Sequence, residues 1–61
     1  MNFKEVEKIL LKDGWVFLKS RGSHRFYTHP IKKGKITIPF HGGKDLAPKT
    51  LNTILKQAGL K

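Results

Sequence analysis

The segment from Arg21 to Arg25 contains the residue types in this chain that could carry out chemistry. A histidine, His24, follows the pair Gly22 and Ser23, and an arginine stands on each side. An unperturbed imidazole can accept or release a proton near neutral pH. Guanidinium groups bind the oxygens of a phosphodiester through charge-assisted hydrogen bonds. We therefore interpret the segment as one that binds RNA and cleaves it, with His24 as general base or general acid.

Cleavage of RNA without a metal needs two proton transfers. A base removes the proton from a ribose 2′-hydroxyl, which attacks the adjacent phosphorus, and an acid protonates the leaving 5′-oxygen. His41 opens a glycine-containing loop and is either the second proton-transfer group, a phosphate donor or a loop residue without a role. Gly22 and Ser23 are expected to shape a turn and to hydrogen-bond to phosphate. Arg21, Arg25 and Lys44 are expected to bind the RNA backbone.

The sequence offers little support for a metal or a cofactor. The histidines at 24, 29 and 41 are spaced five and twelve residues apart, and there is no cysteine. This spacing matches none of the usual zinc-ligand patterns. We expect no metal and no cofactor, and cleavage products that end in a 2′,3′-cyclic phosphate and a 5′-hydroxyl. His29 is expected to be a surface residue at the end of a strand, facing away from His24.

Length and charge restrict the class of protein. The 61 residues predict a single domain over residues 1–61. Thirteen Lys and Arg against four Asp and Glu give a net charge of +9, which favours a polyanionic partner such as nucleic acid or an acidic protein. No apolar run approaches the roughly 20 residues of a membrane span, and the N-terminus lacks a signal-peptide pattern. We therefore expect a cytoplasmic protein that does not act at a membrane.

The hydrophobic pattern predicts an α+β domain with the order α-β-β-β-α. Asn2 and Glu5 form a capping-box pattern that begins the first helix, and the second helix begins near Pro48. The three strands should form an antiparallel sheet with both helices on one face. The expected strands cover residues 15–19, 24–29 and 35–40, with turns at 20–23 and 30–34.

Alternation assigns the side chains of the second strand to two faces. His24, Phe26 and Thr28 share one face, and Arg25 and Tyr27 lie on the other. Aromatic residues among basic ones either stack RNA bases or build the core. We expect Tyr27 to stay on the open face beside Arg25, and the other aromatic residues to enter the core. The side chains expected to point inward from the third strand are Ile36, Ile38 and Phe40.

Four motifs stand out along the chain: Asp13-Gly14-Trp15, Gly22-Ser23-His24, Pro39-Phe40-His41 and Leu51-Asn52-Thr53-Ile54-Leu55-Lys56-Gln57-Ala58-Gly59-Leu60. Together they resemble the HicA family of bacterial and archaeal toxins. The resemblance implies a fold like that of double-stranded-RNA-binding domains and a metal-independent, ribosome-independent mRNA interferase whose essential histidine is His24 here. It also implies a HicB antitoxin as partner, which covers the active face and through which the pair contacts its operon DNA.

A binding module without catalysis remains the alternative. A small RNA-binding domain, or a protein that only docks to HicB, would explain the net charge of +9 without any reaction at His24. The fold does not decide between these functions, since one fold hosts many chemistries.

Overall fold

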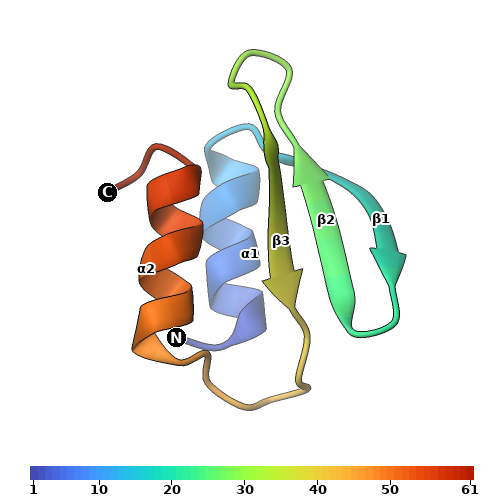
Figure 1. Ribbon diagram of the computed structural model, residues 1–61, viewed down its shortest axis with the longest axis vertical. Helices are drawn as coiled ribbons and strands as arrows, with labels where there is room; N and C mark the ends of the chain where they lie inside the picture. Colours follow the sequence, from blue (N-terminus) through green and yellow to red (C-terminus); the bar gives the residue numbers. More distant parts are fainter.

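Two helices pack against one face of a three-stranded antiparallel sheet, and the other face of the sheet is uncovered (Figure 1). The computed structural model describes all residues, 1–61. The strand order is β1-β2-β3, so β1 and β3 are the edges of the sheet. The α+β architecture expected from the sequence, with the order α-β-β-β-α, is confirmed. The elements are α1 (Phe3–Lys12), β1 (Val16–Arg21), β2 (His24–Thr28), β3 (Lys35–Pro39) and α2 (Pro48–Gln57).

The first helix begins as its sequence predicts. The N–H of Glu5 donates to Asn2 Oδ1 and the N–H of Asn2 donates to Glu5 Oε1, each at 3.0 Å, which is a complete capping box. The helix buries Phe3, Val6 and Leu10, which recur at helical spacing on one side. This stripe forms the part of the core that lies under the sheet.

The second helix begins without a side-chain cap. Pro48 occupies its first turn, and the preceding Ala47 has no side chain that could accept a hydrogen bond from the helix. The helix buries Ile54, and Ala58 at its C-terminal end is also buried. Neither helix is long and apolar enough to cross a lipid bilayer.

Tyr27 lies in the core, so the expectation that it stays on the open face is wrong. Its side chain is 0% exposed, and its hydroxyl donates to the Glu7 carboxylate of α1. Burial, together with this hydrogen bond, raises the pKa of the Tyr27 phenol well above its usual value of 10.0. Tyr27 is paired with buried Ile36, so both side chains point toward the helices. Its neighbour Phe26 therefore points to the open face, where it is half-buried.

The end of β3 also differs from the expectation. Ile36 and Ile38 are both 0% exposed, as predicted, but Phe40 lies beyond the strand and is 38% exposed. Its ring packs edge-on against Phe3, with 5.0 Å between the centroids. Phe40 therefore closes the edge of the core and does not enter its centre.

The first strand contains an irregularity that the sequence does not reveal. The register pairs Phe17 with Tyr27 and Lys19 with Phe26, so one extra residue lies between the two pairs. The strand continues to Arg21, which corrects the expected turn at 20–23 to a two-residue turn. Gly22, at φ +59°, and Ser23 form this turn. A two-residue hairpin with glycine first and a positive φ at that position alone is typical of a type II′ turn.

The loop between β2 and β3 is tied to the C-terminal ends of both helices. Lys32 Nζ donates to Asp13 Oδ2 at 2.6 Å, just after α1, and to the carbonyl of Ala58 at 2.8 Å, just after α2. The hydrogen bond from Lys32 lowers the pKa of the Asp13 carboxyl below its usual range. This contact fixes the end of the molecule opposite the β1–β2 hairpin.

Candidate functional site

The uncovered side of the sheet gathers side chains from all three strands. Directly paired residues of antiparallel strands point to the same face. Because Tyr27 and Ile36 point toward the helices, the residues that alternate with them point away. We call this surface the open face. Its members form three rows across β1, β2 and β3: Arg21, His24 and Pro39; Lys19, Phe26 and Thr37; Val16, Thr28 and Lys35.

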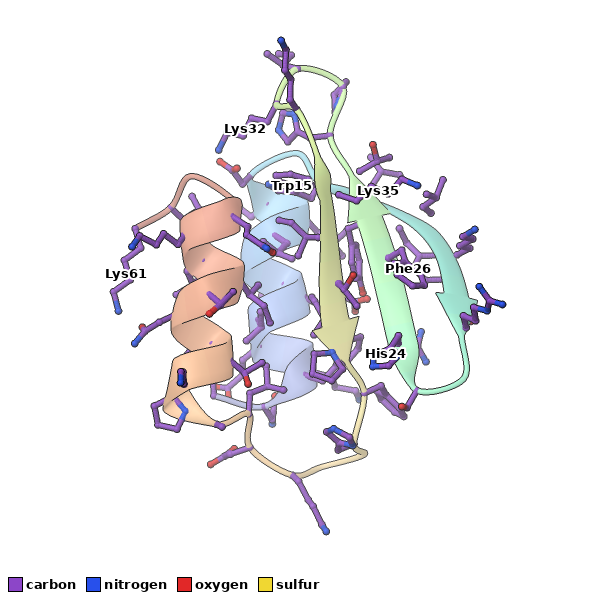
Figure 2. The ribbon with its side chains drawn as sticks, viewed as in Figure 1. Trp15, His24, Phe26, Lys32, Lys35 and Lys61 are labelled. Carbon is purple, nitrogen blue, oxygen red and sulfur yellow. The ribbon has the colours of Figure 1, made fainter.

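His24 lies at the hairpin end of the open face, where β2 begins (Figure 2). Its side chain is exposed, and it is paired with Arg21 across the two-residue turn. Cβ atoms of such a pair lie about 4.5–5.5 Å apart. The guanidinium of Arg21 and the imidazole of His24 can therefore contact the same phosphodiester, one as an anion-binding group and the other as a proton-transfer group.

Phe26 lies two residues further along β2, on the same face as His24. Lys19 of β1 places its ammonium 6.0 Å from the centroid of the Phe26 ring. An aromatic surface among cations is the arrangement that stacks nucleic-acid bases in single strands. The sequence pattern predicted Phe26 in the core and did not single out Lys19 as a ligand-binding residue. The available signal was the alternation that already placed Phe26 beside His24.

Arg25 is held on the opposite face of the sheet from His24. Its guanidinium lies over the rings of Phe3 at 5.1 Å, Phe17 at 6.0 Å and Phe40 at 4.7 Å from the centroids. These cation–π contacts place Arg25 at the edge of the helix-covered side, where it is half-buried. The two arginines that flank His24 in sequence are therefore not brought together, and RNA binding by Arg25 stays a prediction.

The loop after β3 returns to the His24 end of the sheet. The N–H of Phe40 donates to the carbonyl of Ser23 at 2.6 Å, which places the following residue, His41, beside the β1–β2 turn. The N–H of Lys44 donates to the carbonyl of His41 at 3.3 Å and forms a turn in the loop. Both side chains are exposed. Ser23, His24 and His41 thus lie at one end of the sheet, with Lys44 on the adjoining loop.

His29 has a structural environment at the other end of the sheet. Its Nε2–H donates to the carbonyl of Asp13 at 2.9 Å, and its Nδ1 accepts from the N–H groups of Ile31 and Lys32 at 3.0 Å each. The ring packs edge-on against Trp15, with 5.1 Å between centroids. Both ring nitrogens are therefore engaged, and His29 is half-buried where a surface position was expected. No three His, Asp or Glu side chains gather where they could bind a metal ion.

The charges near the open face are of one sign. The three strands contain no Asp or Glu, and the stretch from residue 14 to residue 44 contains seven Lys and Arg without a carboxylate. The only salt bridge joins Lys32 to Asp13, away from His24. Lys19, Arg21 and Lys35 therefore keep their charges unneutralised on the open face, which favours an anionic ligand.

Comparison with known proteins places the chain in a family. A search of curated proteins gave no match. Residues 3–60, nearly the whole chain, match the family described as the HicA toxin of bacterial toxin–antitoxin systems. The match includes both helices, the complete sheet and the His24 hairpin. The chain therefore belongs to the HicA toxin family.

Proposed function

We propose that this toxin is a metal-independent endoribonuclease, an mRNA interferase, in which His24 acts as general base or general acid. One observation carries the proposal. An exposed histidine stands directly opposite an arginine, on a sheet face that has cations and an aromatic ring but no carboxylate. These groups are what a phosphodiester needs for binding and for proton transfer.

The reaction follows from the chemistry of the RNA backbone. A base takes the proton of a 2′-hydroxyl, the 2′-oxygen bonds to the adjacent phosphorus, and the bond from phosphorus to the 5′-oxygen breaks. An acid gives that oxygen its proton, so the products are a 2′,3′-cyclic phosphate and a 5′-hydroxyl. His24 performs one of these two transfers. His41 is the candidate for the other, because its backbone lies beside the turn that precedes His24.

The neighbouring residues bind and position the RNA. Arg21 stabilises the negative charge that develops on the phosphorus oxygens. Gly22 and Ser23 set the turn that directs His24, and the Ser23 hydroxyl donates to a phosphate oxygen. Phe26 stacks one base of a single strand, two residues along β2 from His24. Lys44, from the loop after β3, contributes a further phosphate contact. Arg25 contributes another when its guanidinium moves away from the aromatic rings that it covers.

The partner protein is proposed to be a HicB antitoxin. The family is the toxin half of toxin–antitoxin systems. An acidic partner that covers the open face would neutralise its cations and exclude RNA from His24, since opposite potentials steer association. Any contact with DNA would come through the antitoxin.

A non-catalytic RNA-binding module is the second candidate function. It is favoured by the same positive face, because Phe26 and three cations bind a single strand without any reaction at His24. The two functions differ in one measurement, the dependence of cleavage on the His24 ring.

The test compares the wild type with His24→Ala and His24→Gln on a fluorophore-quencher oligoribonucleotide and by separate equilibrium binding. Loss of a general acid–base group lowers the cleavage rate about 10²–10⁴-fold, while the dissociation constant should stay within a few-fold. Circular dichroism checks that both variants fold. Cleavage at an unchanged rate by a folded His24→Ala protein overturns the proposed mechanism. Products with a 5′-phosphate end contradict the proposed reaction.

A further inference from the structure

A second positive feature lies between α2 and the free edge of β3. Residues of α2 contact β3, and the rest of the sheet extends away on the other side of this strand (Figure 1). A shallow groove of about 310 Å³ runs between the two elements. Six of its seven lining residues are polar or charged. The seven residues come from both walls: Lys35 and Thr37 from β3, and Lys49, Thr50, Thr53, Ile54 and Gln57 from α2.

The groove presents hydrogen-bond donors and positive charge without a compensating carboxylate. Lys35 and Lys49 stand on opposite walls, and neither forms a salt bridge. Neither β3 nor α2 contains an Asp or Glu. The hydroxyl of Thr53 donates to the carbonyl of Lys49 at 3.0 Å, within the helix. The remaining donors of the groove are open to a ligand that accepts hydrogen bonds and carries negative charge.

The groove is continuous with the open face. Lys35 and Thr37 line the groove and also belong to the open-face rows. Thr37 is the direct partner of Phe26, and adjacent strands lie about 4.8 Å apart. His24 is about 6.8 Å from Phe26 along β2. An RNA strand that contacts His24 and stacks a base on Phe26 therefore reaches the groove within one or two further nucleotides.

We infer that the groove binds the phosphate backbone of the same RNA strand whose base stacks on Phe26. The inference rests on the proposed function, because it extends the RNA path that begins at His24. Lys35 and Lys49 hold phosphates as point charges from two sides, and Thr37, Thr50 and Gln57 donate to phosphate or ribose oxygens. The substrate is a single strand, since a base that is paired and stacked in a duplex cannot lie against the Phe26 ring.

The test measures binding of a labelled single-stranded oligoribonucleotide to the His24→Ala protein at several salt concentrations. The groove variant carries Lys35→Gln and Lys49→Gln. Its matched control carries Lys4→Gln and Lys8→Gln, which remove the same charge from exposed positions of α1. The slope of log affinity against log salt is negative, and each lost phosphate contact makes it shallower by about 0.7, so the slope of the groove variant should be shallower than that of the parent by about 1.4. The control should keep the parent slope.

The outcomes separate this inference from the proposed function. If the groove variant and the control have equal slopes while the parent still binds RNA, the inference that the groove binds RNA is overturned. The proposed function is not affected by that result. A parent that binds no RNA at all refutes the proposed function itself. Tighter binding of a duplex of the same sequence contradicts the single-strand assignment. A groove variant that loses antitoxin affinity but keeps the RNA slope shows that the groove is a protein contact.

Discussion

Phe26 and Tyr27 are adjacent aromatic residues that serve opposite sides of the sheet. Tyr27 packs under the sheet, hydrogen-bonded to Glu7, and its ring lies 5.8 Å from that of Phe17. Phe26 faces solvent beside the Lys19 ammonium. The core depends on Tyr27, whereas Phe26 is free to contact a ligand.

Substitution of these two rings should separate stability from binding. Phe26→Ala removes a stacking surface, which is worth about 1–3 kcal/mol per base, so single-strand affinity should fall by about 5- to 150-fold. Tyr27→Phe removes the hydroxyl that donates to Glu7 and should lower the free energy of unfolding by about 1 kcal/mol. The RNA affinity should be unchanged. Chemical denaturation and fluorescence anisotropy measure the two quantities. A Phe26→Ala protein that binds RNA as tightly as the parent would refute base stacking on this ring.

At the scale of single residues, alternation predicted which side chains share a face but not which face the helices cover. It placed Phe26 with His24 correctly. The assignment of Tyr27 to the open face failed because its hydroxyl has a partner on α1, Glu7, twenty residues away in sequence. A phenol that is satisfied by a helix carboxylate can be buried at little cost. No local pattern contains that information.

The β1–β2 hairpin is the element that positions the proposed chemistry. Its turn places Arg21 opposite His24, and the irregularity between Phe17 and Lys19 sends Phe17 to the helix side while Lys19 stays on the open face. Strict alternation would have kept Phe17 and Lys19 on one face. Helix starts were predictable because the capping box of the first helix and the first-turn proline of the second are local signals, but a bulge depends on pairing with another strand.

Gly22 should be the sensitive position of this hairpin. Its φ of +59° strains any residue with a Cβ, although no atom lies within 4 Å of a Cβ built there. Gly22→Ala should therefore cost about 1–2 kcal/mol, which lowers Tm by about 4–16 °C in a domain of this size. It should also slow cleavage, because Arg21 and His24 flank the turn.

Gly43→Ala is the matched control for the hairpin variant. Gly43 has equally open surroundings but no positive φ, so its replacement should leave Tm unchanged or slightly raised. Thermal unfolding followed by circular dichroism compares the two proteins. Equal Tm values for both variants would show that the turn conformation does not limit stability.

Charge is the property that acts across the whole molecule. The net charge is +9, while the structure contains one salt bridge. Self-repulsion of this kind opposes the compact state and is reduced when salt screens the charges. The same charges attract RNA, and that attraction also weakens in salt. Stability and RNA affinity should therefore respond to salt in opposite directions.

This opposition gives a prediction for the wild-type fold and the His24→Ala binding assay. Phosphate contacts from Lys19, Arg21, Lys35 and Lys49 give a slope of about −2.8, so affinity for a single strand should fall about 50-fold between 50 and 200 mM NaCl. Over the same range the Tm of the free protein should rise, because screening relieves repulsion among unpaired cations. Differential scanning fluorimetry and anisotropy titrations at matched salt provide both curves. A Tm that falls with salt would mean that attractive ion pairs outweigh repulsion among the cations. An RNA affinity that does not change with salt concentration would mean that the open face does not bind phosphates.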